Sequence, residues 1–122
     1  MKHLLVALVL FSSSYIGAQT AVSPSKKIEV NFKLSATGQP TYSVKYNKNT
    51  VVEKSAMGFT LKDKAALTTD FTIEKVENSS FNESWKPVLG EQASIVNHYN
   101  ELKVALIQKE SNIKMTIFFR VF

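Results

Sequence analysis

The sequence predicts an all-β protein: a β-sandwich, or part of one, with about eight short and mostly antiparallel strands. Three observations lead to this prediction. Apolar and polar residues alternate along several stretches, which is the two-residue period of a half-buried strand. Turn residues separate these stretches at intervals of roughly 8–12 residues. No long stretch has the 3.6-residue period of an amphipathic helix, so the pattern argues against a helical or mixed fold.

The first predicted strand covers residues 28–34, where every second residue is apolar. Residues 37–40, with the sequence Thr-Gly-Gln-Pro, have turn chemistry, because glycine tolerates positive φ and proline fixes its own φ. A second alternating stretch follows at residues 42–46. Together these segments predict a β-hairpin whose apolar face carries Ile28, Val30, Phe32, Leu34, Tyr42, Val44 and Tyr46.

The next part of the chain predicts two more short strands. Residues 47–49 (Asn-Lys-Asn) indicate a turn, and the β-branched stretch 50–52 follows it as a strand. Residues 57–61 alternate again and predict another strand. Residues 62–69 suit either one helical turn or a loop, because their apolar run is too short to decide.

The stretch 71–76 begins as an alternating strand and slips by one position at Val76, which indicates a β-bulge. We expect residues 78–80 (Asn-Ser-Ser) to form a loop, and residues 81–91 contain two aromatic residues, a proline and a glycine. Residues 95–108 suit a strand or a helix. We assign a strand because the second half of this stretch alternates strictly.

The last predicted strand covers residues 113–122 and has apolar side chains on both faces. Such a strand is typical of the middle of a core, and at a sheet edge it favours pairing between chains. We therefore expect the chain alone to be poorly soluble or oligomeric, and we expect Phe119→Lys to improve its solubility. The sequence ends inside this strand without a turn or polar tail, so we also expect truncation of a longer domain.

Length and composition limit the class of protein. The 122 residues suffice for one domain, and 44% hydrophobic with 20% charged residues is typical of a soluble globular protein. The formal net charge is +5, but the basic residues are scattered, which argues against nucleic-acid binding. The chain has no cysteine and only two histidines, so disulfides, thiolate catalysis and cysteine-ligated zinc are excluded.

Residues 1–18 have the layout of a secretory signal peptide. A basic start precedes an apolar run from Leu4 to Phe11, and small residues follow up to Ala18. A run of this length spans roughly 12 Å as a helix, whereas a membrane core is roughly 30 Å thick. We expect cleavage after Ala18, secretion, and no membrane contact afterwards. Residues 19–27 then form an extended leader, and residues 28–122 form the first part of a β-sandwich domain.

The sequence predicts no catalytic site and no metal site. A Ser-His-Asp arrangement would depend on His98 without a supporting motif, and a single histidine cannot build a zinc site. No carboxylates have the spacing of a calcium loop. Glutamates such as Glu83, Glu91 and Glu101 could supply a glycosidase carboxyl pair, but glutamates scattered through strands usually face solvent.

Two segments carry the candidate binding residues. Trp85 is the only tryptophan, which in an all-β protein is usually a core anchor and sometimes a platform for sugar stacking. The segment 97–101 (Asn-His-Tyr-Asn-Glu) has hydrogen-bonding side chains at consecutive positions. Unless it is a plain exposed edge, such a segment faces a polar partner or a ligand. The interdomain or sugar-facing candidates are therefore Trp85, Glu91, Asn97, His98, Asn100 and Glu101.

Three longer motifs carry a family resemblance: Trp-Lys-Pro-Val-x-Gly-Glu at 85–91, Ile-x-Asn-His-Tyr-Asn-Glu-Leu at 95–102 and Ile-x-Phe-Arg-Val-Phe at 117–122. Upstream, Ser-Pro at 23–24, Gly-Gln-Pro-x-Tyr-x-Val at 38–44 and Gly-Phe at 58–59 fit the same pattern. These motifs together resemble the N-terminal region of glycoside hydrolase family 97. The resemblance covers essentially all of the chain after the predicted signal peptide.

The resemblance implies a secreted, mostly periplasmic α-glucosidase or α-galactosidase. Such an enzyme has a large N-terminal β-supersandwich of the galactose-mutarotase-like type, a catalytic (β/α)₈ barrel and a small C-terminal β-domain. The family also implies a calcium ion that helps to bind substrate, and carboxylates that act at the barrel. No barrel strand is recognisable in the chain, so no catalytic or calcium-binding residue is carried over.

The resemblance therefore predicts a non-catalytic part of such an enzyme, inactive alone, that packs on the barrel and shapes its pocket. Its expected partners are the barrel and an oligosaccharide. The alternative is a free-standing secreted β-sandwich that binds carbohydrate or protein through Trp85 and residues 97–101. The sequence leaves open which α-glycoside is cleaved and whether cleavage inverts or retains the anomeric configuration.

Overall fold

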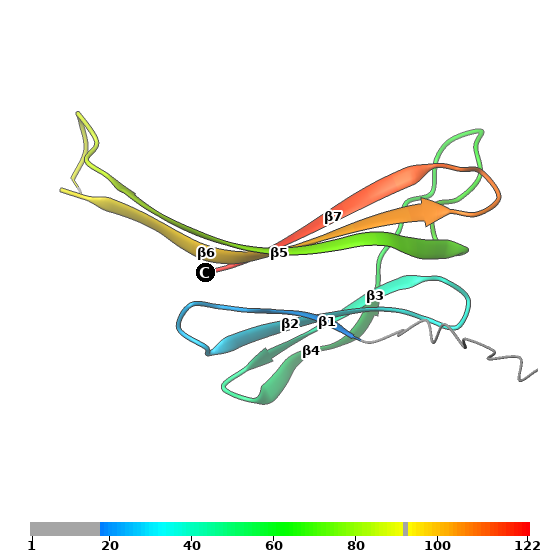
Figure 1. The fold of residues 1–122 in the computed structure, drawn as a ribbon, viewed down its shortest axis with the longest axis horizontal. Helices are drawn as coiled ribbons and strands as arrows, with labels where there is room; N and C mark the ends of the chain where they lie inside the picture. The colour runs from blue at the N-terminus through cyan, green and yellow to red at the C-terminus, as the bar shows by residue number, and fades with distance from the viewer. Residues whose placement is uncertain (1–17, 92) are drawn as a thin grey trace, which may run out of the picture.

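The computed structural model describes residues 18–91 and 93–122. In these ranges seven strands form two antiparallel sheets that face each other (Figure 1). The predicted all-β fold is thus confirmed. No helix in the described ranges is long and apolar enough to cross a membrane. The predicted signal peptide, residues 1–18, lies outside the described residues except for its last position.

The first sheet has the strand order β1-β2-β3-β4. Its strands are β1 (Gln19–Val22), β2 (Ile28–Leu34), β3 (Pro40–Tyr46) and β4 (Asn49–Ala56). The second sheet has the order β5-β6-β7, with β5 (Phe71–Trp85), β6 (Ile95–Gln108) and β7 (Lys114–Val121). Within each sheet, every connection joins strands that are neighbours in that sheet, so each sheet is a simple meander.

The core lies between the two sheets and uses the alternating residues that the sequence indicated. Phe32 of β2 is fully buried, and the ring of Phe119 on β7 packs against it with centroids 5.9 Å apart. Three alternate residues of β6 point into the same layer. The buried apolar residues are Ala21, Val30, Phe32, Leu67, Phe71, Leu102, Val104, Leu106 and Val121.

Two turns follow directly from local sequence. Asn47 and Lys48 connect β3 to β4 with φ values of 47° and 69°. Two consecutive positive φ values are the geometry of a type I′ turn, which matches the twist of the strands it joins. Asparagine tolerates this region better than most residues. The predicted turn at residues 47–49 is therefore confirmed.

Gly38 lies where the two sheets approach each other at one end of the sandwich. Its φ is +71°, and a Cβ there would lie 2.7 Å from the backbone nitrogen of Phe71. The Phe71 N–H donates a 3.1 Å hydrogen bond to the Gly38 carbonyl, which holds the two backbones together. Replacing Gly38 by alanine should lower the free energy of unfolding by about 2 kcal/mol or more, because it adds backbone strain to a steric clash.

Gly90 is the matched control for that substitution. Its φ is 141°, but nothing lies within 4 Å of an added Cβ. Gly90→Ala therefore adds backbone strain without the clash, and urea unfolding should show a clearly smaller loss than for Gly38→Ala. Equal losses would contradict the role assigned to the contact between Gly38 and Phe71.

Three segments differ from the strands expected from sequence. Residues 19–22, which we expected in an extended leader, form β1 and pair with β2 from Gln19 to Val22. Residues 78–80, expected as a loop, and residues 81–85 both belong to β5, which is 15 residues long. Their polar sequence is compatible with a strand because the partner strand β6, also long, lies beside them over their whole length.

The stretch 57–61 forms no regular strand and makes one isolated bridge between Phe59 and Leu67. It therefore belongs to the connection between the two sheets, where a single bridge replaces a ladder. The expected β-bulge in β5 is present, with the shift in register between Ile73 and Lys75. It lies just before the position at which the alternation slips.

β7 forms an edge of the second sheet, because it pairs only with β6 among the described strands. As expected, alternate residues of β7 face inward and outward. Phe119 faces inward and contacts the rings of Phe32 and Tyr42, whereas Phe118 is 52% exposed on the opposite face. The expectation that Phe119→Lys improves solubility is therefore wrong, since the ammonium group would enter the core.

Phe118→Lys is the substitution that should reduce self-association. It keeps the core intact and adds a charge to the exposed face of an edge strand, which disfavours pairing between chains. We expect sedimentation velocity to show a shift from oligomers toward monomer for Phe118→Lys at unchanged far-UV circular dichroism. Phe119→Lys should instead lose cooperative unfolding. An unchanged oligomer distribution in Phe118→Lys would exclude this edge as the contact.

Candidate functional site

The β5–β6 hairpin extends past the first sheet as a two-stranded ribbon (Figure 1). We refer to residues 81–85 and 95–99 as the arm. Every residue of β5 from Asn78 onward is exposed, so this ribbon lies outside the core. The arm, its base and the turn that joins its strands contain all six candidate residues predicted from the sequence.

The strand register places these candidates on two opposite faces. Trp85 pairs with Ile95, and Glu83 pairs with Asn97. Directly paired residues share a face and successive residues alternate, so these four lie together with Glu101 on the outer face. The inner face, which is turned toward the first sheet, carries the remaining strand candidates His98 and Asn100 with their partners Asn82 and Ser80. Residues 97–101 therefore do not form one polar surface, contrary to the sequence interpretation.

Asn100 connects the two sheets. Its Nδ2 donates a 2.7 Å hydrogen bond to the carbonyl of Val22 on β1, and its Oδ1 accepts a 2.6 Å bond from the Ser80 hydroxyl. Both ends of the amide are thus used within the protein. Asn100 holds the base of the arm over β1, so its role is structural.

Asn100→Ala should lower the free energy of unfolding by about 1–3 kcal/mol, because the part-buried Val22 carbonyl loses its donor. Asn97→Ala is the matched control, since Asn97 lies three residues away on the outer face of the same strand. Chemical denaturation should show little change for Asn97→Ala. The assignment fails if both variants unfold at the same urea concentration.

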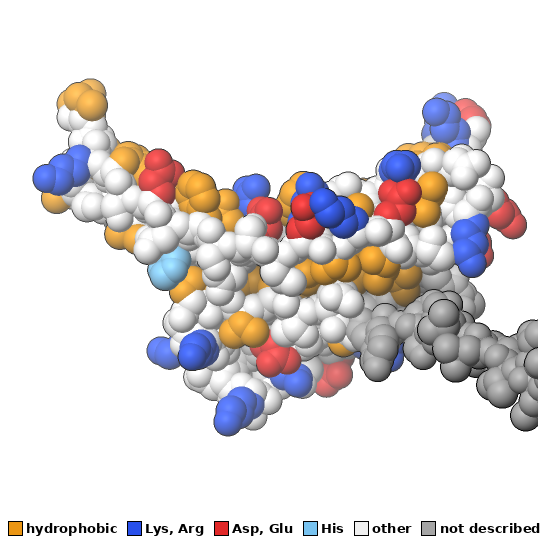
Figure 2. Space-filling model, viewed as in Figure 1, with side chains coloured by type: hydrophobic (Ala, Val, Ile, Leu, Met, Phe, Trp, Pro, Cys, Tyr) orange, Lys and Arg blue, Asp and Glu red, His pale blue; other side chains and the backbone are white. Residues whose placement is uncertain are grey.

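The outer face of the arm carries four aromatic side chains, with Glu83 and Asn97 lying between Trp85 and the other three. Tyr99 stacks on Phe81 with centroids 5.3 Å apart and planes inclined by 23°, and it meets Phe122 at 5.1 Å. Trp85 lies on the same face nearer the tip and is 44% exposed. Figure 2 shows hydrophobic side chains gathered along this part of the molecule. We refer to Trp85, Phe81, Tyr99 and Phe122 as the aromatic row.

A charged pair lies at the base of the aromatic row. The Arg120 guanidinium donates a 2.7 Å hydrogen bond to the Glu101 carboxylate and lies 5.4 Å from the centroid of the Tyr99 ring. The hydrogen bond to Glu101 raises the pKa of Arg120. Because Glu101 is paired with Arg120, its carboxylate is a poor candidate for acid–base chemistry.

The rest of the same outer face, above the core, is covered by ion pairs. Glu77 contacts the ammonium groups of Lys75 at 2.8 Å and Lys103 at 3.1 Å, and Lys114 pairs with Glu74 at 3.1 Å. Hydrogen bonds from Lys75 and then Lys103 lower the pKa of Glu77. Such a face is compatible with water. Phe118, whose ring is 52% exposed next to the Lys103 ammonium, lies among these charges.

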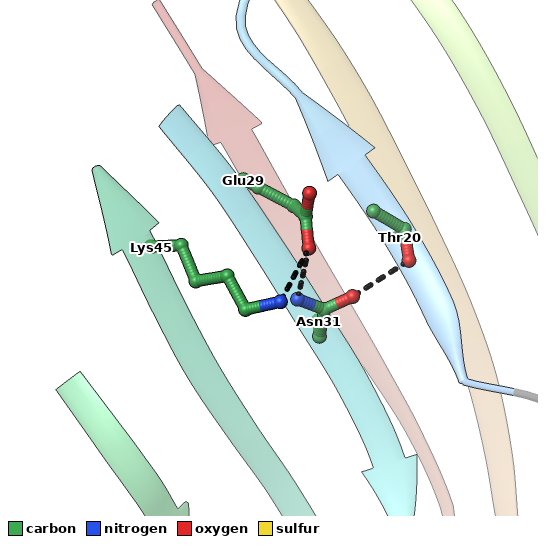
Figure 3. Close-up of polar contacts among 4 residues, drawn as sticks. All are labelled: Thr20, Glu29, Asn31 and Lys45. Carbon is green, nitrogen blue, oxygen red and sulfur yellow. Dashed lines mark hydrogen bonds and ion pairs between the residues drawn. The ribbon is translucent and has the colours of Figure 1, made fainter. Parts of the chain in front are cut away.

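The outer face of the first sheet is polar as well (Figure 3). Thr20 donates to the Asn31 side-chain oxygen at 2.8 Å, and the Asn31 amide donates to Glu29 at 2.7 Å. Lys45 completes the set at 3.4 Å from the same carboxylate. The hydrogen bond from Asn31, assisted by Lys45, lowers the pKa of Glu29. This ladder belongs to a solvated surface.

A shallow cleft of about 300 Å³ lies where β1 approaches β5 and β6, and Asn100 and Glu101 are among its lining residues. The amide of Asn100 and the carboxylate of Glu101 are both bound to other protein groups. Few free polar atoms of these two residues thus remain to hold a ligand. Glu91 lies away from this cleft, in the exposed turn that connects β5 to β6.

Within the described ranges, no three histidine, aspartate or glutamate side chains lie close enough together to hold a metal ion. We therefore assign no calcium ligand to the described residues. Three of the described glutamates are held in ion pairs with lysine, and Glu101 is held by Arg120.

Sequence reasoning missed most of the aromatic row. Phe81 was assigned to no element, and Phe122 was counted only as part of a two-faced strand. The signal that could have found them is the pairing register, because Phe81, Tyr99 and Phe122 are separated in sequence and become neighbours only across three adjacent strands. Arg120 was missed for the same reason.

The fold and this surface define a β-sandwich module with an exposed two-stranded arm. The profile of the Glycosyl-hydrolase 97 N-terminal family matches residues 21–122. The chain belongs to this family. The resemblance recognised from the sequence motifs is therefore confirmed.

Solved structures agree with this assignment. A glycoside hydrolase family 97 enzyme from Pseudoalteromonas sp. strain K8, in complex with acarbose, is 28% identical and superposes with a TM-score of 0.79 over 85% of this chain. A variant of that enzyme in complex with panose gives a TM-score of 0.78 at the same identity. A β-arabinopyranosidase, 22% identical with a TM-score of 0.73, shares the fold. The chain spans only 16% of the first enzyme.

Proposed function

We propose that the chain is the N-terminal β-sandwich part of a secreted family 97 α-glycosidase, where it packs on the catalytic barrel and shapes the rim of its pocket. The observation that carries this proposal is the family match over residues 21–122. The same segment spans 16% of an enzyme whose remaining length has to supply the catalytic residues. The chain then acts as scaffold, and the barrel performs the chemistry.

The described side chains support a scaffold role. Glycoside hydrolysis needs two carboxyl groups on opposite sides of one glycosidic bond, with one of them protonated. Glu101 is held by Arg120 and Glu91 lies in an exposed turn, so these two do not converge on a common cavity. In the proposal, the calcium ligands of the intact enzyme belong to its other segments.

Secretion to the periplasm forms part of the same proposal. It is supported by the basic start, the short apolar run and the small residues that precede Gln19. The absence of cysteine is compatible with an oxidising compartment, because no thiol needs protection there.

A free-standing carbohydrate-binding module is the second candidate, and the exposed aromatic row is the observation that favours it. Sugars stack on the open face of an aromatic ring. Tyr99 lies between Phe81 on one neighbouring strand and Phe122 with Arg120 on the other. The ring best placed in the row thus has no open face, which favours the first candidate.

The test mixes this chain with the Pseudoalteromonas enzyme from which the matching segment has been deleted. Size-exclusion chromatography with light scattering should detect a 1:1 complex, and calorimetry with panose should detect no binding to the chain alone. Binding of panose to the chain, without complex formation, would contradict the proposal and favour the free-standing module.

A further inference from the structure

We propose that the free edge of β7 and the uncovered inner face of β3 and β4 together form an acceptor site for a further β-strand. The added strand pairs antiparallel with β7 and has apolar side chains at every second position, which lie over β3 and β4. In an intact family 97 enzyme, the polypeptide that follows the matching segment supplies this strand. The inference therefore rests on the proposed function and adds to it a contact site and the chemistry of its occupant.

The first argument is the offset between the two sheets. β1 packs against β6 and β7, and β2 packs against β7. β3 and β4 lie further along the first sheet and make no comparable contact with a described strand of the second sheet. Neighbouring strands are about 4.8 Å apart, so these two strands extend the first sheet by about 10 Å beyond β2. The second sheet thus ends at β7 while the first sheet continues.

The second argument is that the burial of inward-facing side chains falls across this offset. The inward-facing residues in the second half of β6 are fully buried, whereas Met115, Ile117 and Phe119 of β7 are only partly buried. In the first sheet, burial likewise falls from β2 to Val44 on β3 and Val52 on β4. Apolar side chains on one face of a strand are typical of a face that another layer covers.

The bulge in β4 determines which side chains the site presents. Val52 pairs with Val44 on β3, and Thr50 pairs with the next residue of β3, Lys45. Successive residues of a strand point to opposite faces, so Val52 lies on the inner face with Val44 and Thr50 lies on the outer face with Lys45. The uncovered part of the inner face is therefore apolar at these positions, which suits an apolar side chain on the added strand.

The third argument is the free edge of β7. β7 pairs with β6 on one side, and no described strand pairs with it on the other side. Alternate N–H and C=O groups of an edge strand point away from the sheet and are available to another strand. The rings of Tyr42 on β3 and Phe119 on β7 meet with centroids 6.3 Å apart, so β3 begins beside this edge. A strand added to β7 would lie over the uncovered face.

The comparisons supply the occupant. The matched family is the N-terminal part of such enzymes, and the matching segment spans 16% of the Pseudoalteromonas enzyme. Most of that polypeptide therefore follows the segment and leaves it from the end of β7. Every connection within the two sheets of this chain joins neighbouring strands, and consecutive strands are neighbours in most sheets. The strand that follows β7 along the enzyme is thus the occupant with the shortest connection to the site.

The absence of cysteine from the chain allows a test with single thiol probes. In a hybrid enzyme, residues 21–122 with Val52→Cys replace the matching segment of the Pseudoalteromonas enzyme. The reaction of this thiol with N-ethylmaleimide is followed by mass spectrometry of its peptide. The reference is the isolated Val52→Cys chain at a concentration at which it sediments as a monomer. The labelling rate should be at least about tenfold lower in the hybrid, because a covered thiol reacts only after local opening. Hydrogen–deuterium exchange of β7 should slow in the same comparison.

Thr50→Cys is the matched control, because Thr50 lies on the outer face of the same strand. Its thiol should react equally fast in both proteins. A hybrid that hydrolyses p-nitrophenyl α-glucoside while Val52→Cys labelling and β7 exchange stay as in the isolated chain would overturn the acceptor site and leave the proposed function standing. Slower labelling without slower exchange in β7 would also overturn it, since the cover would not be a paired strand.

Two further outcomes separate the remaining occupants. Protection in the hybrid that disappears on dilution would assign the site to a second copy and overturn the inference. A hybrid that folds but has no more activity than the enzyme without the segment would overturn the proposed function and the inference with it.

Discussion

Replacing Phe32 by alanine should lower the free energy of unfolding by about 3–5 kcal/mol, the largest stability effect that we expect from a single substitution. Phe32 is 0% exposed and packs against Phe119 across the two sheets. Truncation removes its buried area and leaves a cavity that two sheets joined through the same core cannot easily close. A small domain has a total stability of about 5–15 kcal/mol, so this loss should leave the variant barely folded.

Phe118→Ala is the control for residue type, because Phe118 is 52% exposed on the outer face of β7. Thermal unfolding followed by circular dichroism should separate the two variants clearly, with a change of about 0.5 kcal/mol or less for Phe118→Ala. If Phe32→Ala were as stable as Phe118→Ala, the two sheets would not share the core described here.

The second large effect concerns activity. The chain alone should release no p-nitrophenol from α-linked glucosides or galactosides above the rate of a heat-denatured sample, with or without added calcium. The physical reason is that no pair of carboxyl groups encloses a sugar-sized cavity in the described part of the chain. Enzymatic glycoside hydrolysis lowers the barrier by many kcal/mol, and an open surface supplies little of this.

Glu91 offers the sharpest contradiction of that prediction. It is the glutamate of the 85–91 motif, and it lies in an exposed turn beside Gly90. Turnover that depends on calcium and disappears in Glu91→Gln would show that the turn is catalytic and that the scaffold interpretation is wrong. The Glu83→Gln variant serves as the control, because Glu83 is also exposed but pairs within the arm.

The sequence predicted the core well because burial leaves a strong local signal. Alternation at residues 28–34 and in the second half of β6 placed Val30 and Phe32, and Leu102, Val104 and Leu106, on the apolar faces of two strands. The structure buries these residues in one core. Turn chemistry at residues 47–49 gave the β3–β4 connection, because two positive φ values strongly restrict the residue types.

The arm could not be predicted in the same way. β5 has no buried side from Asn78 onward, so residues 78–80 at the base of the arm show no alternation and resemble a loop. Pairing with β6, not local propensity, makes them a strand. The failure of the 57–61 prediction is the reverse case: the alternation is present, but Phe59 remains 61% exposed and forms only one bridge.

The candidate site was predicted in part. The motifs at 85–91 and 95–102 directed attention to the β5–β6 hairpin, and the family match covers both motifs. Local sequence could not show that Asn100 faces Val22, or that Trp85 and His98 lie on opposite faces, because both depend on the pairing register. The arrangement of the arm thus depends on contacts between residues that are distant in sequence.

The most direct test of the central claim replaces the matching segment of the Pseudoalteromonas enzyme by residues 21–122 of this chain. The account predicts that the hybrid enzyme keeps its kcat/KM for p-nitrophenyl α-glucoside to within about tenfold, equivalent to about 1.4 kcal/mol. Deletion of the segment should abolish measurable activity. A hybrid that folds and binds acarbose but has no more activity than the deletion would contradict the claim that the chain is an interchangeable structural part of such an enzyme.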